Sequence, residues 1–161
     1  MAAGTLVYLA SVLWTTTQLP VDGVPLHFDA SGTVDRFGTR DDAISAYSVL
    51  GGLVTLIAIG SLCLARWGPL TLVNTPHKEY WTTQERRSRF RRMMTDDLGL
   101  VMGILLAYLS TIPFATAWAL RSDPPALPPH LLWIPLAALV IATIVWCVWL
   151  SRVRYDPARQ E

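Results

Sequence analysis

The chain has 161 residues, of which 52% are hydrophobic and 16% charged, and its formal net charge is +1. All of its charged residues (13 Lys and Arg, 12 Asp and Glu) fall outside four uncharged apolar stretches, 2–19, 43–65, 98–120 and 131–150, which together hold 84 residues. A soluble domain would mark the outer face of each helix with charged residues every turn or so. The composition therefore excludes a soluble fold, a disordered chain and a small disulfide-stapled secreted protein.

Each stretch is long enough to cross a bilayer, because about 20 residues at about 1.5 Å per residue match a hydrocarbon core of roughly 30 Å. The sequence predicts an all-α integral membrane four-helix bundle, one polytopic domain over residues 1–161, with a short extracellular β-hairpin-like loop between the first two helices. The first stretch is the weakest of the four, since it starts close to Met1 and ends in the polar run 15–18. A cleaved signal peptide and a truncated start are the alternatives there, although this stretch lacks a basic n-region and a small-residue cleavage site.

Lys and Arg are distributed unequally between the two sides of such a bundle. The loops after the first and third stretches contain three of them, Arg36, Arg40 and Arg121, whereas the loop after the second stretch and the tail contain ten. Short loops that carry positive charge stay cytoplasmic. Both termini and the second loop are therefore predicted inside, and the first loop, in which five Asp face two Arg, is predicted outside.

The first loop reads LPVDGVPLHFDASGTVDRFGTR over residues 19–40, and its two short runs, 24–28 and 33–37, are separated by Asp29-Ala30-Ser31-Gly32. These four residues are typical of a tight turn, because Asp and Ser bond their own backbone and Gly accepts a positive φ. We predict a small hairpin on the outer surface. Asp41 and Asp42 are predicted in the first turn of the next helix, where carboxylates complement the helix dipole.

His27, Asp29 and Asp35 raise the question of a metal or acid-base site in this loop. The set lacks the dense spacing of a calcium loop and the paired histidines of a zinc motif. Hydrogen bonds and ion pairs that pin the loop are therefore the favoured interpretation. We predict no cofactor, and the metal site stays as the alternative.

The second loop, residues 74–97, is rich in arginine. Thr82 followed by Glu85 is a capping-box pattern, so a helix is predicted to start at Thr83. Its arginines alternate with Phe90 and two methionines, which favours a helix lying at the anionic inner leaflet. A docking site for a cytoplasmic protein or for nucleic acid is the alternative, and we predict no nucleic-acid partner. Contact with lipid head groups is predicted for Arg87, Arg89, Arg91 and Arg92.

Small residues, prolines and aromatics add detail to the spans. Gly99 and Gly103 indicate close helix packing, within the bundle as the favoured interpretation or in a homodimer as the alternative. Pro113 predicts a kink. Tryptophans at both ends of the spans are predicted to lie at head-group depth, Trp67, Trp81, Trp146 and Trp149 on the inner side and Trp118 and Trp133 on the outer side. Cys63 and Cys147 are predicted to be free thiols.

Two motifs in the loops carry a resemblance to a known family. The first comprises Leu19, Pro20, Val24, Pro25, His27, Phe28, Gly32, Asp35, Arg36, Phe37 and Gly38. The second comprises Asn74, Pro76, Lys78, Glu79, Tyr80, Trp81, Glu85 and Arg86. Over roughly the first 95 residues the chain resembles a bacterial integral-membrane family catalogued as a domain of unknown function, also found fused in SdpI-type immunity and signalling proteins.

The resemblance implies a multi-pass protein of the bacterial inner membrane, with immunity to a secreted toxic peptide or sequestration of a repressor as suggested roles. It supplies no catalytic residue. The residues themselves show no Ser/His/Asp set, HExxH, phosphate-binding glycine loop or CxxC. The apolar stretches also lack the ionisable residues that coupled transport uses.

The leading hypothesis is therefore a non-catalytic membrane protein, not an enzyme, that acts in sensing, immunity or partner binding through its outer loop and its basic inner helix. A protein or peptide partner is expected at these loops in addition to the bilayer. The alternatives are a small membrane enzyme or metal-dependent site at His27, Asp29 and Asp35, and a passive transporter subunit.

Overall fold

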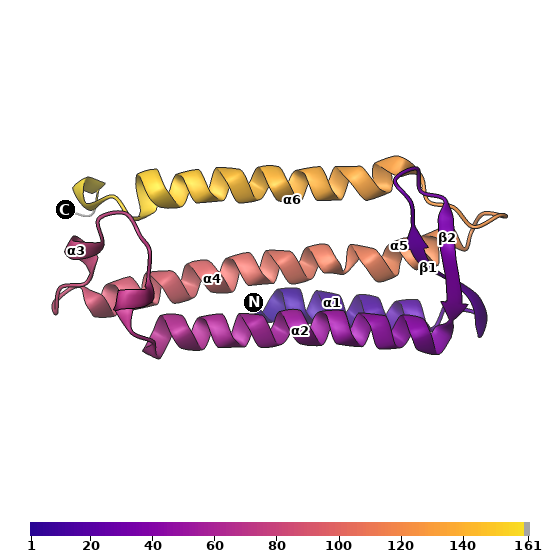
Figure 1. The fold of residues 1–161 in the computed structure, drawn as a ribbon, viewed down its shortest axis with the longest axis horizontal. Coiled ribbons are helices and arrows are strands. Elements are labelled where there is room, and N and C mark those ends of the chain that lie inside the picture. Colours follow the sequence, from indigo (N-terminus) through magenta and orange to yellow (C-terminus); the bar gives the residue numbers. More distant parts are fainter. Residues whose placement is uncertain (160–161) are drawn as a thin grey trace.

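The computed structural model describes residues 1–159 and shows long helices lying side by side, with different small elements at their two ends (Figure 1). The order along the chain is α1 (Ala2–Thr16), β1 (Asp22–Phe28), β2 (Val34–Thr39), α2 (Arg40–Trp67), η1 (Leu70–Leu72), α3 (Lys78–Trp81), α4 (Arg87–Leu109), α5 (Thr111–Ala119), α6 (Pro129–Trp149), η2 (Leu150–Arg154) and η3 (Pro157–Arg159). We call the end that carries β1 and β2 the hairpin end. The opposite end, which carries α3 and the start of α4, is the arginine end.

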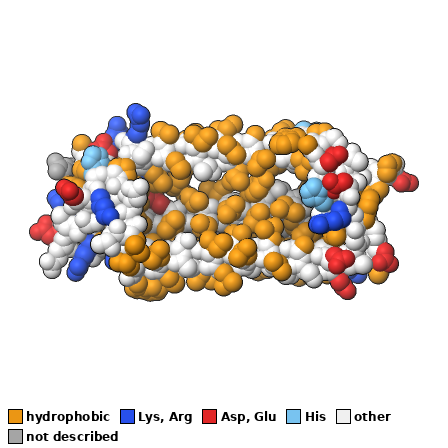
Figure 2. Space-filling view, viewed as in Figure 1, with side chains coloured by type: hydrophobic (Ala, Val, Ile, Leu, Met, Phe, Trp, Pro, Cys, Tyr) orange, Lys and Arg blue, Asp and Glu red, His pale blue; other side chains and the backbone are white. Residues whose placement is uncertain are grey.

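Three helical segments are long and apolar enough to cross a membrane: Arg40–Trp67, Arg87–Ala119 and Pro129–Arg154. On the face shown in Figure 2, hydrophobic side chains gather over the long middle of the molecule, and charged side chains gather at its two ends. The prediction of a mostly helical chain with a small hairpin is thereby confirmed, and the three apolar segments support a membrane protein. α1 has 15 residues, or about 22 Å of helix, which is less than the roughly 30 Å of a bilayer core. A four-span bundle, in which α1 would also cross the membrane, therefore stays a prediction.

The start of α2 confirms the predicted acidic first turn. The Thr39 hydroxyl accepts from the Asp42 backbone N–H at 3.1 Å, and the Asp42 carboxylate accepts from the Thr39 N–H at 2.9 Å. This reciprocal pair is a capping box, which satisfies two backbone donors that have no partner inside the helix.

The predicted helix start at Thr83 is wrong. Residues 82–86 form turns, and α4 begins at Arg87 without a side-chain cap. The Thr83 hydroxyl bonds back to the Tyr80 carbonyl at 3.4 Å, so the local pattern serves the end of α3. From Arg87 the helix runs without interruption to Leu109, so the basic inner helix and the third span are one element.

α4 and α5 are separated by a break at Ser110, three residues before Pro113. Proline has no N–H to donate to the carbonyl four residues earlier, and its ring clashes with that carbonyl. The helix is therefore interrupted close to Pro113, and the kink itself stays a prediction. Pro113 lies in the third position of α5 and is buried.

The predicted hairpin is confirmed. β1 and β2 pair antiparallel, with Val24 opposite Gly38 and His27 opposite Arg36. In the turn, the Asp29 carboxylate accepts from the Ser31 N–H at 2.8 Å and from the Thr33 N–H at 3.0 Å.

The proline-rich loop before α6 docks on this turn. The Leu127 N–H donates to the Gly32 carbonyl at 2.9 Å, and the Trp133 indole N–H donates to the Ala30 carbonyl at 3.1 Å. These bonds attach the start of α6 to the hairpin. Along α6 itself none of the residues is buried among the described part of the chain, so its position depends on its two ends.

The small residues on α4 serve packing within the chain. A Cβ added to Gly4 would overlap the Gly103 carbonyl, so the backbones of α1 and α4 touch at this point. Gly103 is therefore already covered by α1, as the favoured interpretation of this motif predicts. A homodimer through Gly99 and Gly103 stays a prediction and would need α1 to make room. Cys63 and Cys147 are free, as predicted, and both are exposed.

Glycine 32 provides a test of the hairpin and of its contact with the loop before α6. It has φ +88°, and a Cβ there would overlap the Leu127 carbonyl, whereas Gly23 has φ +74° and open space around it. We expect Gly23→Ala to lower the free energy of unfolding by about 1 kcal/mol through backbone strain alone. Gly32→Ala should lower it by about 2–4 kcal/mol, because overpacking adds to the strain. Equal losses, measured by denaturant unfolding in detergent, would contradict the docking of this loop.

Candidate functional site at the arginine end

The C-terminal tail is tied to α4 by a buried carboxylate. The Tyr155 hydroxyl donates to Asp97 Oδ2 at 2.8 Å, and Arg154 Nε donates to the same oxygen at 3.4 Å. Only 8% of Asp97 is exposed. We call these three residues the tail anchor. Burial raises the pKa of the Tyr155 hydroxyl well above its ordinary value, and the bond to the Asp97 carboxylate raises it further, so Tyr155 remains a neutral donor.

Aromatic side chains surround the tail anchor. Trp81 stacks on Phe90 with ring centroids 5.8 Å apart, and the Tyr155 ring meets both edge to face at 6.1 and 5.7 Å. The Trp81 indole N–H also donates to the Tyr155 carbonyl at 3.0 Å. Trp81 is 1% exposed and belongs to the buried core of this end, and its predicted position at head-group depth stays a prediction.

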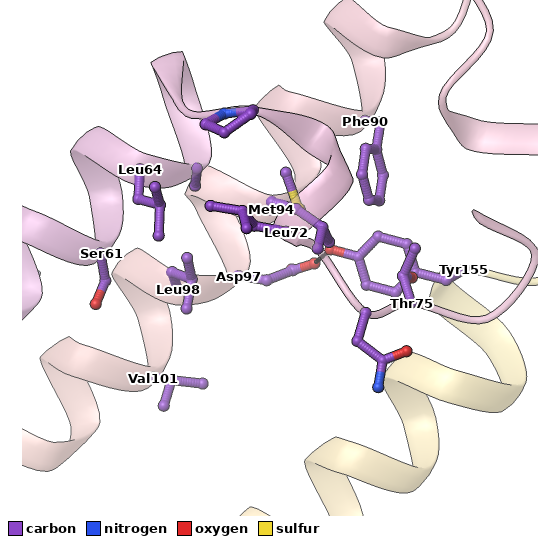
Figure 3. A pocket seen from close by; sticks show the side chains of 14 residues that line it. Ser61, Leu64, Leu72, Thr75, Phe90, Met94, Asp97, Leu98, Val101 and Tyr155 are labelled. Carbon is purple, nitrogen blue, oxygen red and sulfur yellow. Dashed lines mark hydrogen bonds between the residues drawn. The ribbon is translucent and has the colours of Figure 1, made fainter. Parts of the chain in front are cut away.

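A cavity of about 410 Å³ lies beside the tail anchor. Figure 3 shows Asp97, Tyr155 and Phe90 on one side of it and Leu64 and Ser61 of α2 on the other. Most of its walls are apolar, and the polar groups among them are few. Its lining consists of Ser61, Leu64, Ala65, Pro69, Leu72, Val73, Asn74, Thr75, Phe90, Met94, Asp97, Leu98, Val101 and Tyr155. We call it the apolar cavity.

The second motif organises this end of the molecule. Lys78 Nζ donates to the Thr71 carbonyl at 2.8 Å, and the Arg86 guanidinium lies 4.1 Å from the centre of the Tyr80 ring. Asn74 lines the apolar cavity and Trp81 forms the core described above. Pro76, Glu79 and Glu85 are exposed.

The four arginines predicted to contact lipid head groups divide between two sides of α4. Arg87 and Arg91, one helical turn apart, line a hollow together with Lys78. Arg89 and Arg92 line another hollow, which also contains Glu85 and Asp96. The sequence alone predicts one role for all four arginines, whereas the structure places them in two hollows of different charge.

The first motif lies at the opposite, hairpin end, and several of its members are structural. Leu19 and Val24 belong to a buried cluster with Ala43 and Tyr47, and Pro25 is fully buried. The Arg40 guanidinium donates to the Leu19 carbonyl and so joins the start of α2 to the segment that follows α1. Gly38 packs closely against Leu26 and Asp42. Pro20, Phe28, Arg36 and Phe37 are at least partly exposed.

The structure brings together two of the three residues of the alternative metal or acid-base site, His27 and Asp35. His27 Nδ1 and Asp35 Oδ1 are 2.7 Å apart, and both side chains are largely exposed. Asp29 instead bonds within its own turn, and the bonds from Ser31 and Thr33 lower the pKa of its carboxyl. Within residues 1–159 no group of three His, Cys, Asp or Glu side chains is placed to hold a metal ion. Asp29 therefore serves the turn and does not join the pair of His27 and Asp35.

The sequence places Asp97 directly before the uncharged stretch 98–120 and indicates no partner for it. In the structure Asp97 lies inside α4, and its partners are 57 and 58 residues away. One signal was present, since Asp97 is the last carboxylate before an uncharged stretch and Tyr155 is the one aromatic residue in the basic tail. Neither observation predicts which residue bonds to Asp97.

The chain was compared with family models, with curated proteins and with solved structures, and no match was found in any of the three. The functional conclusion therefore depends on the geometry of the two ends.

The tail anchor can be tested with two Tyr→Phe substitutions. Tyr155→Phe removes the hydroxyl donor from a buried carboxylate, so the free energy of unfolding should fall by about 1–3 kcal/mol. Tyr108→Phe is the control, because the Tyr108 hydroxyl has no hydrogen bond to any described residue. It should change stability by less than about 0.5 kcal/mol. Limited proteolysis should also release the tail faster in Tyr155→Phe; similar behaviour of the two variants would contradict the anchor.

Proposed function

We propose that this chain is a non-catalytic, multi-pass membrane protein that senses a small apolar molecule held in the apolar cavity at its arginine end. The observation that carries the proposal is the cavity itself, about 410 Å³ in volume and walled by α2, α4, the loop between them and the tail. Ligand pockets in proteins are typically of this size, with mostly apolar walls and a few polar groups that fix orientation.

The wall of the cavity links ligand binding to the tail. Tyr155 contributes its ring to the cavity and its hydroxyl to Asp97. A molecule in the cavity therefore contacts the residue that holds the tail in place. Binding would shift the equilibrium between the anchored and the released tail, and the size of this shift is set by the difference in the affinity of the molecule for the two states. This is a binding and signalling arrangement, and it needs no catalytic group.

The charge distribution supports an orientation for this proposal. The segments at the hairpin end contain six Asp and three Arg, a formal charge of −3, and the remaining segments contain ten Lys or Arg and six Asp or Glu, a formal charge of +4. We propose that the arginine end faces the cytoplasm of a bacterial cell and the hairpin end faces outside. A tail released at the arginine end then meets cytoplasmic partners.

A second candidate function is immunity or sensing at the hairpin end. Phe37 is 51% exposed and Val21 is 68% exposed, and both lie in a segment rich in carboxylates. Exposed apolar side chains beside negative charge favour a cationic amphipathic peptide as the partner. This candidate uses the same orientation, and it corresponds to the immunity role that the resemblance to a family of unknown function suggests.

The cavity can be tested by filling it. We expect the wild-type protein, purified in mild detergent, to retain a stoichiometric apolar molecule that mass spectrometry detects. Val101→Trp places an indole in the cavity and should reduce this occupancy at least about tenfold. Val140→Trp is the matched control, because Val140 lies on α6 and is 48% exposed. A retained molecule in Val101→Trp, or none in the wild type, would count against the proposal.

The orientation can be tested by thiol labelling. In a background with Cys63 and Cys147 replaced by Ala, a membrane-impermeant maleimide added to intact cells should modify Ser31→Cys at the hairpin end. It should modify Ser88→Cys, at the arginine end, only after the membrane is opened. The reverse pattern would overturn the orientation.

A further inference from the structure

A hollow of about 370 Å³ at the arginine end brings positive charges together without a negative one. It is lined by Leu70, Thr71, Lys78, Thr82, Arg87 and Arg91. Of these described residues three are cations, two carry hydroxyl groups and none is acidic. We call it the basic hollow. Like charges around one hollow repel one another, and an anion between them would relieve this repulsion.

Two of the cations are fixed in position by neutral acceptors. The Arg91 guanidinium donates to the Ala65 carbonyl at 3.1 Å and to the Gly68 carbonyl at 2.7 Å, at the C-terminal end of α2. Lys78 Nζ donates to the Thr71 carbonyl. Carbonyl groups hold these side chains without cancelling their charge, and each cation keeps further N–H donors. Arg87 is exposed and forms no ion pair with a described residue.

Exposed apolar side chains lie close in sequence to the hollow. Trp67 at the end of α2 is 72% exposed, and Leu72 beside the hollow is 69% exposed. α2 is one of the segments able to cross a membrane. An anion here is therefore placed at the level where head groups meet acyl chains.

We propose that the basic hollow binds the phosphate group of an anionic phospholipid, whose acyl chains lie along the exposed apolar face of α2. Arginine and lysine are the usual partners of phosphate oxygens, and basic pockets beside membrane helices recognise anionic head groups. The proposal concerns a different hollow from the apolar cavity, so either one can fail while the other holds.

The neighbouring hollow on α4 provides the contrast. It contains Arg89, Arg92 and Arg154, but Glu85 and Asp96 line it as well. Its charges are largely balanced within the protein. The site is therefore assigned to Arg87 and Arg91, one turn apart, with Lys78 from α3, and Arg92 is outside it.

The test compares two arginines of one helix in the full-length chain. Dioleoylphosphatidylglycerol is titrated into the detergent-solubilised protein and bound lipid is measured by native mass spectrometry, with dioleoylphosphatidylcholine as the neutral comparison. Arg87→Gln should weaken phosphatidylglycerol binding about fivefold, the effect of one cation near an anionic surface, and Lys78→Gln with Arg87→Gln about 30-fold. Arg92→Gln removes the same charge from an exposed position on α4 and should leave binding within about twofold.

Three outcomes would overturn the proposal. Equal losses for Arg87→Gln and Arg92→Gln would indicate general charge attraction without a site. Equal affinity for phosphatidylglycerol and phosphatidylcholine would exclude anionic recognition. If millimolar inorganic phosphate displaces the lipid completely and binds by itself, the hollow takes a soluble phosphate. Arg87→Lys, which keeps the charge, should retain most of the binding, and circular dichroism checks that each variant is folded.

Discussion

The order of the arginine end depends on the burial of one carboxylate. A buried charge is costly unless hydrogen bonds and an opposite charge compensate it. Asp97 lies inside α4, and its described partners come from the tail, so the tail has to fold back onto the helix. Once Tyr155 is in place, its ring meets Trp81 edge to face and its carbonyl accepts from the Trp81 indole N–H. α3, the tail and the cavity wall are therefore fixed together.

The bonds of Tyr155 and Arg154 to Asp97 also hold the C-terminal end of α6 in position beside α4. α6 buries none of its residues against the described helices, and at its other end it is attached to the hairpin turn. A helix that is apolar all round is expected in lipid, where no hydrophobic force drives it onto its neighbours. Polar anchors at both ends then replace packing along its length. The hydrogen bonds to the hairpin turn at one end of α6 and to Asp97 at the other end have this role.

The sequence predicts the features that arise locally. The uncharged stretches identify three spans, because length and composition alone decide whether a helix suits a bilayer. The hairpin follows from Asp29 and Gly32, whose chemistry specifies a turn within four residues. The start at Thr83 fails because a capping box is a weak local preference, and here the contacts of α3 override it. The tail anchor was not predictable, since nothing in the sequence pairs Asp97 with a residue 58 positions later.

The apolar cavity and the basic hollow share a wall. Within the short segment that follows α2, Pro69, Leu72 and Val73 line the cavity, whereas Leu70 and Thr71 line the hollow. Arg91 bonds Gly68 directly before this segment, and Lys78 bonds Thr71 within it. An anion in the hollow would hold both cations and so would stiffen the wall of the cavity. Coupling between two sites is reciprocal. A molecule in the cavity would therefore change the affinity of the hollow for lipid by the same factor by which bound lipid changes the affinity of the cavity for that molecule.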